Sequence, residues 1–422
     1  MKKSLLRAAL VACLPFCAMA LAVVTTPAVA AEKGPVISKS IIKYMTEAKK
    51  ANDAKDWKTV IEQCKLALQA TDRTDYDNYM INRFLAVAYF NSGDHASARG
   101  SFEAVVKNPA TPLEDRKYLE VPAMELAAEA NDYAKVIELG KIALQDDPNN
   151  ADVLAELSIA YYDVNDFTNA QTFAQKAIDQ AAASGKMAQY GTYQVLAFSY
   201  DKQKKTADEV RAFELMARDY GKPDDWKYLL DFSLELLPGS NKNMKEIAAL
   251  DLFRLRMITA APWSGQNYAE MADAAQAQRS WGDAHEALQK GLASGALQQA
   301  KVGALMAQVN ADAKKDEPAL PAVEKLAKTG KEMTNVAEGY YGYGRYADAA
   351  RAAQKAIELG GPSVAEAQLV LGMSQVRLGD EANAAKTLAA VSGDPAIMRA
   401  AQLWSVYVSR KYDRAPAAPA TH

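Results

Sequence analysis

From about residue 40 onward, the chain repeats one pattern of apolar and polar positions. A stretch with helical spacing ends in a short polar turn, an aromatic side chain follows the turn, and small apolar residues then recur every three or four positions. After Phe167, for example, these small residues are Ala170, Ala174 and Ala177. Such spacing places the small residues on one face of a helix. The pattern therefore predicts pairs of helices that stack on neighbouring pairs, because a single pair cannot bury its own apolar face.

The period of the pattern is close to constant. The residues that follow the turn in the first four copies are Trp57, His95, Tyr133 and Phe167, which are 38, 38 and 34 residues apart. We predict an all-α, right-handed solenoid of about ten helix pairs over residues 31–412. The clearest copies lie at 41–70, 79–108, 117–150, 151–184, 190–220, 265–295, 330–362 and 365–394.

Two stretches and the end of the chain depart from this pattern. In 222–262, Pro238-Gly239 stands at the expected turn, but the second helix is apolar and lacks the small residues. In 300–330, Pro318 and Pro321 are expected to start the second helix. Residues 396–412 predict a single capping helix with Trp404 on its inner face, and 413–422 predict a disordered tail.

The repeated unit resembles the tetratricopeptide repeat, a helix–turn–helix of about 34 residues. The first-helix half of that motif is matched by Leu85, Ala86 and Tyr89, and again by Leu371-Gly372. The resemblance covers nearly all of the chain after residue 30. It implies a curved array whose concave face is lined by first helices and holds peptides or partner helices.

Eight residues are expected to face a partner on that concave surface. They are Arg83, Val87, Phe90, Ile159, Tyr162, Gln194, Phe198 and Tyr341. The alternative for each is a place in the core shared by adjacent repeats. The Lys/Asn clamp with which some proteins of this family hold a terminal carboxylate does not appear at these positions, so an apolar or mixed ligand surface fits better.

The first thirty residues have the order of a secretory signal peptide. Lys2, Lys3 and Arg7 precede an apolar stretch over 8–24, and Ala28-Val29-Ala30 forms an A-x-A cleavage site. We expect cleavage after Ala30 and release into the periplasm, without an integral membrane segment in the remainder. Leu10-Val11-Ala12-Cys13 resembles a lipobox, but the apolar stretch between Arg7 and Cys13 is too short for lipidation at Cys13.

Composition and charge narrow the range of functions. Half of the residues are apolar but only 8% are aromatic, which favours packed helices. The 49 basic and 52 acidic residues do not indicate binding to nucleic acid or to an acidic membrane surface. Cleavage would remove Cys13 and Cys17, so Cys64 would remain alone and no internal disulfide could form.

The sequence offers little material for catalysis. None of the H-E-x-x-H, C-x-x-C, G-x-S-x-G or Walker-type motifs is present. His95 stands at an aromatic turn position, His285 is expected on a helix surface, and Cys64 is expected to be a buried small hydrophobe. The pair Asp224-Asp225 is explained by helix capping. We therefore predict a protein with neither catalytic, cofactor-binding nor metal-binding residues.

A narrower resemblance comes from the layout of several segments. The segments 222–226, 357–361, 368–373 and 399–404 are similar to those of periplasmic repeat proteins that accompany TonB energy-transducing systems. This similarity implies a non-enzymatic adaptor that contacts TonB or its motor proteins. The alternative is a periplasmic carrier or chaperone for exported peptides or outer-membrane protein precursors. A divergent envelope enzyme is a third class, and it would need a catalytic pair.

Overall fold

The computed structural model of this chain describes residues 35–410, and within them every regular element is an α-helix. The predicted signal peptide with its lipobox, and the predicted tail 413–422, lie outside the described residues. The prediction of an all-α helical solenoid is confirmed. The described chain divides into two compact units, unit 1 up to Lys204 and unit 2 from Lys205.

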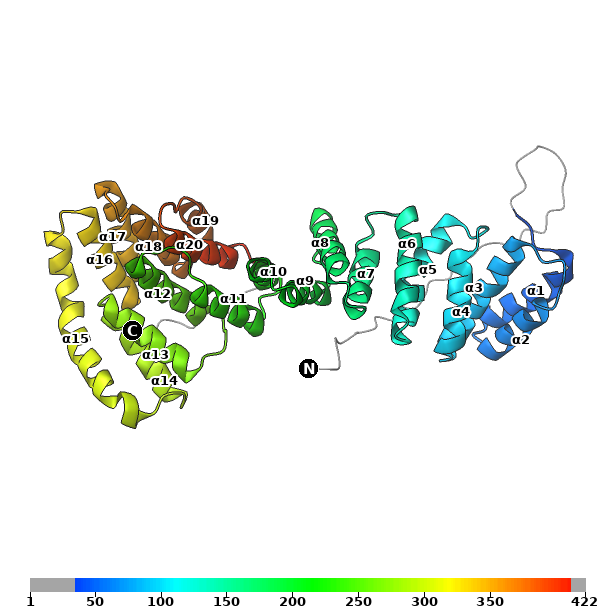
Figure 1. The fold of residues 1–422 in the computed structure, drawn as a ribbon, viewed down its shortest axis with the longest axis horizontal. Helices are drawn as coiled ribbons and strands as arrows, with labels where there is room; N and C mark the ends of the chain where they lie inside the picture. Colours follow the sequence, from blue (N-terminus) through cyan, green and yellow to red (C-terminus); the bar gives the residue numbers. More distant parts are fainter. Residues whose placement is uncertain (1–34, 411–422) are drawn as a thin grey trace. The chain divides into compact units, whose positions relative to one another are not determined.

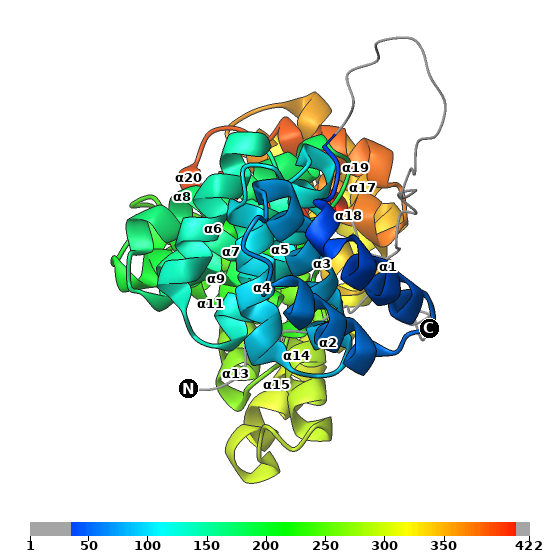
Figure 2. The same ribbon diagram turned by 90° about the vertical axis from the view of Figure 1, so that its right-hand side faces the viewer.

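Unit 1 contains nine helices. They are α1 (Lys39–Asp53), α2 (Trp57–Ala67), α3 (Asp75–Asn91), α4 (His95–Lys107), α5 (Leu113–Glu129), α6 (Tyr133–Asp146), α7 (Ala151–Asp163), α8 (Phe167–Ala183) and α9 (Tyr190–Lys202). Each helix packs on the next one along the chain. Three pairs of alternate helices are also in contact: α1 with α3, α5 with α7, and α7 with α9. The pairs α1–α2 and α3–α4 are seen from the side in Figure 1 and from the end of the unit in Figure 2.

Unit 2 contains eleven helices. They are α10 (Thr206–Asp219), α11 (Pro223–Glu235), α12 (Lys242–Ile258), α13 (Gly265–Ala277), α14 (Trp281–Ala293), α15 (Gln299–Leu326), α16 (Gly330–Gly342), α17 (Tyr346–Leu359), α18 (Val364–Arg377), α19 (Glu381–Ala389) and α20 (Pro395–Val408). The long helix α15 is drawn in yellow in Figure 1.

The turn inside each helix pair of unit 1 follows from a short sequence signature. The residue before the N-cap has a positive φ, for example 58° at Asn131 and 82° at Gly93. An aspartate then caps the second helix: the Asp132 carboxylate accepts from the backbone N–H of Lys135. The aromatic residue begins the helix directly after this cap. Glycine or asparagine followed by aspartate therefore marks where α4, α6 and α8 begin, and Lys55-Asp56 marks the start of α2 in the same way.

The small residues of the second helices form the core, as the spacing predicts. Cys64, Ala174 and Ala353 are fully buried, and so are their neighbours one helical turn away. Small side chains allow close approach of the helix axes. The buried Cys64 behaves as a small hydrophobe, and desolvation raises the pKa of its thiol to about 12.

The predicted repeat 190–220 is divided between the two units. Its first helix, α9, packs on α7 and α8, whereas its second helix, α10, packs on α11 and α20. The turn between them lacks the usual signature, because Lys205 provides no side-chain cap and Thr206 stands where other copies have an aromatic residue.

The segment 300–330 forms one helix, α15, and the predicted helix pair is wrong there. Pro318 and Pro321 lie inside α15 and do not start a second helix. The residues between Asn310 and Pro318 are alanine, lysine, aspartate and glutamate, without a glycine that could form a turn. The carbonyl groups that the prolines leave without a donor belong to exposed Lys314 and Glu317, where water can satisfy them.

The last helix, α20, does more than cap the preceding pair. It packs on α18 and α19, as expected, but also on α10 and α12 at the start of unit 2. The Trp404 side chain is fully buried, and its indole N–H donates to the carbonyl oxygen of Asp251 at 3.0 Å. Helices α14, α16, α18, α20 and α12 thus form an inner ring that closes on itself, with α14 and α12 joined through side chains.

Candidate functional site

The predicted partner-binding residues of unit 1 lie on three first helices. Arg83, Val87 and Phe90 are half-buried on α3. The Arg83 guanidinium pairs with Asp115 of α5 at 2.9 Å, and the Phe90 ring stacks on His95 with centroids 5.3 Å apart. These two side chains therefore also join neighbouring helices.

Helices α7 and α9 carry the other predicted residues of unit 1. Ile159 and Tyr162 on α7 and Gln194 on α9 are half-buried, and Phe198 on α9 is 37% exposed. Because α7 and α9 pack side by side, these four residues come from adjacent first helices. We call Ile159, Tyr162, Gln194 and Phe198 the α7–α9 face.

Tyr341 does not lie on a surface. It is only 5% exposed, and its ring packs beneath the Arg254 guanidinium at 4.7 Å and against the edge of Tyr346. The prediction that Tyr341 faces a partner is wrong. In unit 2, α16 belongs to the closed inner ring, so its inner side faces other helices of the same unit.

An ionic cluster occupies the middle of this inner ring. Arg254 of α12 donates to Asp251 at 2.8 Å, to Asp283 of α14 at 2.6 Å and to Glu338 of α16. Ser280 also donates to Asp283 at 2.6 Å. We call these five residues the Arg254 cluster. It joins three helices that are distant in sequence.

The Arg254 cluster holds more negative than positive charge. Three carboxylates surround one guanidinium, and Asp251, Arg254 and Asp283 are all buried. Desolvation, and then the charge of Glu338, raise the pKa of Asp251 well above its usual range. The closeness of the helices leaves no room for a ligand: a Cβ on Gly342 would meet the Ser280 hydroxyl at 2.4 Å. The cluster is therefore a structural element of unit 2.

Unit 2 also has an open groove on a different side of α12. Helices α11 and α13 form its walls and α12 its floor, and its volume is about 880 Å³. Half-buried Leu234 and Trp263 and buried Phe253 supply its large apolar side chains. Carboxylates line both walls (Asp231, Glu235, Glu270 and Asp273), and Glu246 adds a fifth on the floor. We call this the α11–α13 groove.

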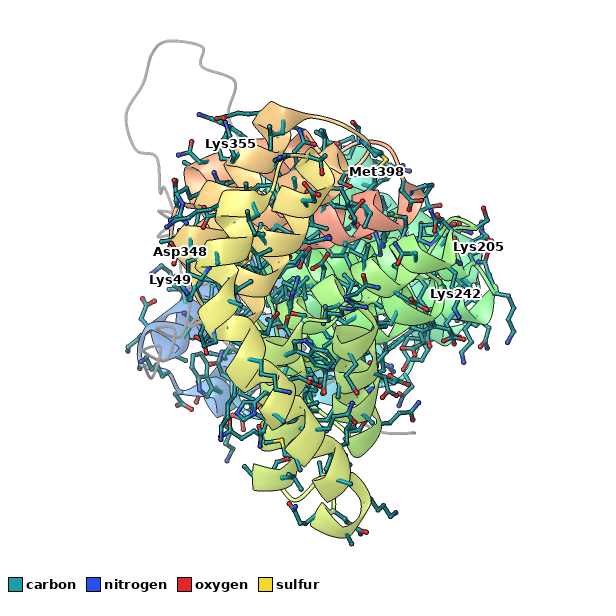
Figure 3. All side chains as sticks on the ribbon, turned by 90° about the vertical axis from the view of Figure 1, so that its left-hand side faces the viewer. Lys49, Lys205, Lys242, Asp348, Lys355 and Met398 are labelled. Carbon is teal, nitrogen blue, oxygen red and sulfur yellow. The ribbon has the colours of Figure 1, made fainter. Side chains whose placement is uncertain are left out.

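The two cationic side chains of the groove, Arg256 and Lys227, already form hydrogen bonds with neighbouring groups. Arg256 donates to Asp231 at 2.7 Å and to the carbonyl oxygen of Pro262 at 3.1 Å. Lys227 donates to the same Asp231 at 2.8 Å. Lys242, at the start of α12, projects outward from unit 2 in Figure 3 and lies 3.6 Å from Glu246.

Sequence reasoning did not find the groove or the cluster. Both are built on α12, and the sequence pattern identified this segment only as an apolar second helix without small residues. Arg254 and Arg256 within that apolar run were an available signal, because a charged residue on a buried helix must be paired. Their partners lie up to 84 residues away in sequence and could not be identified from the pattern.

His95 has the turn position expected of it, whereas His285 lies between α14 and α15 and not on an open helix surface. His95 begins α4 and lies 3.0 Å from Glu129 through Nδ1. His285 of α14 is half-buried, and its Nδ1 lies 2.6 Å from the side-chain oxygen of Asn310 on α15. Among residues 35–410, we find no cluster of three or more histidine, cysteine or acidic side chains suited to a metal ion.

A family comparison identifies one part of the chain. Residues 337–396 match the tetratricopeptide repeat model. They run from α16 to the start of α20 and include the Tyr346 turn and its small-residue helix. Tetratricopeptide repeats form helical interaction scaffolds, so a protein partner is implied for this chain. No curated protein shows a significant match to the sequence.

Several solved structures are similar to the chain at low identity. A tetratricopeptide repeat protein from Parabacteroides merdae is 12% identical, with 64% of this chain and 99% of that one covered and a TM-score of 0.34. The C-terminal part of a TPR repeat-containing protein from Cytophaga hutchinsonii is 10% identical, covering 75% and 95%, with a TM-score of 0.32. MamA from Desulfovibrio magneticus is 13% identical, covering 47% and 97%, with a TM-score of 0.31.

Each of the helices within residues 35–410 is too short or too polar to cross a bilayer.

Proposed function

We propose that this chain is a non-enzymatic interaction scaffold of the periplasm that acts as an adaptor in a TonB-dependent transport system. The observation that carries the scaffold role is the α7–α9 face, where apolar and aromatic side chains of two adjacent first helices are partly exposed. The periplasmic location rests on the order of residues 1–30. The TonB role rests on the sequence similarity of the four segments named above.

The α7–α9 face suits a protein partner better than a small molecule. Phe198 and Tyr162 supply flat aromatic surface, and Gln194 supplies an amide that can both donate and accept. Aromatic side chains of this kind dominate the binding energy of protein interfaces. The face lies on regular helices, so a partner would meet a preformed surface.

The test is photocrosslinking in the native host. A photoreactive amino acid at position 198 or at position 162 is expected to capture TonB or one of its motor proteins, identified by mass spectrometry. The same substitution at Met187, which is exposed in the loop between α8 and α9, serves as a matched control. Position 187 is expected to give little of that adduct.

Three other outcomes would count against the proposal. A broad set of outer-membrane protein precursors captured at position 198 would show a carrier or chaperone. Equal adducts from positions 187 and 198 would show that the α7–α9 face has no special role. Fractionation of the same cells tests the location, and recovery of the protein in the cytoplasm would overturn it.

A further inference from the structure

The α11–α13 groove has the form of a docking site for an extended chain. Its walls are first helices, and along each wall the lining residues recur at three- or four-residue spacing: Lys227, Asp231 and Leu234 on α11, and Gln266, Glu270 and Asp273 on α13. Each set therefore lies on one side of its helix. A volume of about 880 Å³ is at the upper end of the range for ligand-binding clefts.

The charge of the groove is strongly one-sided. Five carboxylates and two cations line it, so negative charges exceed positive ones by three. Both cations are held at the Asp231 end by the bonds described above. At Glu235 and Asp273, both exposed, the structure shows neither an ion pair nor a hydrogen bond with another described side chain. Their charge is therefore available to a ligand.

The apolar side chains lie between these charges. The Trp263 ring stacks on the Tyr268 ring, with centroids 4.6 Å apart. This contact fixes the Trp263 indole just before the N-terminus of α13. Phe253 and Leu234 continue the apolar surface toward α11. A ligand that fills the groove must therefore combine positive charge with an apolar or aromatic side chain.

We propose that the α11–α13 groove binds a lysine- or arginine-rich extended segment of a partner protein, with an apolar side chain seated against Trp263 and Phe253. Cations of the segment face Glu235 on one wall and Asp273 on the other. A small polycation would satisfy the carboxylates but would leave the apolar floor in contact with water, so a peptide uses more of the surface. This surface is separate from the α7–α9 face and belongs to a different unit.

The test is direct binding of a defined probe to the full chain. The probe is a fluorescein-labelled nonapeptide, GKKPWKKSG, in which proline favours an extended backbone. Fluorescence anisotropy is expected to show saturable binding at low salt that weakens as ionic strength rises, because exposed charges are screened. A peptide with glutamate in place of all four lysines is expected not to bind.

Variants then locate the binding site. Glu235→Lys together with Asp273→Lys is expected to weaken the affinity at least about tenfold. Asp312→Lys together with Glu317→Lys on α15 makes the same charge change outside the groove and is expected to leave the affinity unchanged. Ala277→Trp adds bulk to the exposed end of the groove without altering charge, and it too is expected to weaken binding.

Three results would overturn the proposal. They are absence of binding to the unaltered protein up to about 1 mM peptide, equal weakening by the α15 control variant, and full displacement of the peptide by spermine at equal concentration. The last result would assign the groove to a small polycation. The altered residues lie outside the unit that carries the α7–α9 face, so crosslinking there is expected to be unaffected, and failure here and failure of the adaptor role are distinguishable.

Discussion

Single residues matter most in this chain where ionisable side chains are buried among helices that pack mainly through alanine and leucine. The Arg254 guanidinium pairs with three carboxylates from three helices, and it also packs on the ring of Tyr341. Removal of the Arg254 guanidinium leaves three carboxylates without a counter-charge in a largely buried site. The effect on stability is then much larger than for a pair at the surface.

Replacement of Arg254 by methionine is expected to destabilise unit 2 by about 3–5 kcal/mol, because three carboxylates lose their partner. Arg211→Met is the matched control, since Arg211 is exposed and pairs only with Asp208 on its own helix. It is expected to cost less than about 1 kcal/mol. Chemical denaturation of both variants measures the difference, and equal losses would contradict a structural role for the cluster.

Glu120 of α5 shows the same principle in unit 1. It is fully buried, and desolvation followed by the charge of Asp146 raises its pKa from 4.5 to about 7. A raised pKa in the folded state means that ionisation disfavours folding. Unit 1 is therefore expected to lose stability as the pH rises from about 4.5 to 7, and to change little through this group at higher pH.

Replacement of Glu120 by glutamine removes this ionisation. We expect the Glu120→Gln variant to be more stable than the unaltered protein by about 1–3 kcal/mol at pH 8, and to have little advantage at pH 4. Thermal unfolding at the two pH values measures the effect. A gain of the same size at pH 4 and pH 8 would show that packing, and not charge, is responsible.

At the scale of elements, α14 and α16 approach so closely that only glycine fits between them. A Cβ on Gly342 would lie 2.4 Å from the Ser280 hydroxyl and 2.9 Å from an oxygen of Asp283, two members of the Arg254 cluster. A Cβ on Gly282 would similarly meet the backbone carbonyl of Gly342 at 2.3 Å. The two glycines therefore set the distance at which Arg254 can reach both helices.

Gly342→Ala is expected to lower stability by about 1–3 kcal/mol, because the helices must separate or the cluster must rearrange. Gly303→Ala in α15 is the contrast, since the nearest atom to its Cβ belongs to the movable side chain of Gln299. There the better helix propensity of alanine is expected to raise stability by up to about 1 kcal/mol. If both variants lost stability equally, close approach at Gly342 would not be the cause.

Helix α20 has the same importance for the beginning of unit 2 as for its end. Trp404 reaches the backbone of α12, and Arg399 donates to Ser233 of α11 at 3.0 Å and pairs with Glu214 of α10. A helix that only capped the last repeat would touch α18 and α19 alone. The contacts with α10, α11 and α12 show that the last helix completes the core at both ends of the unit.

At the scale of the whole molecule, the division into two compact units allows a test of whether α20 completes the core of unit 2. Trp404→Ala removes a fully buried side chain and is expected to cost unit 2 about 3–5 kcal/mol, while unit 1 keeps its stability. Calorimetry of the full chain is expected to show one transition that moves to lower temperature and one that does not. Met398→Ala, at an exposed position of the same helix, is the control and is expected to move neither. A joint shift of both transitions after Trp404→Ala would contradict independent units.

Much of the architecture could be predicted from the sequence because it depends on neighbours in the chain. The aspartate caps, the positive-φ residues before them and the small residues after them act within one helix pair, so the turns at Trp57, His95, Tyr133 and Phe167 and the buried positions of Cys64 and Ala174 followed from local pattern. The buried Trp404 followed from the same amphipathic spacing. In 300–330, where the local signature is absent, the prediction of a regular helix pair was wrong.

The sequence by itself determined an all-helical array, the position of most turns and the absence of familiar catalytic motifs, because these depend on interactions over a few residues. Only the tertiary structure decided that α20 returns to α12, that Arg254 meets Glu338, that Tyr341 is buried and that α11 and α13 enclose an acidic groove. The Arg254–Glu338 contact joins residues 84 positions apart, and the Trp404–Asp251 contact joins residues 153 positions apart. Their geometry depends on the curvature accumulated over many helix pairs, which no single repeat specifies.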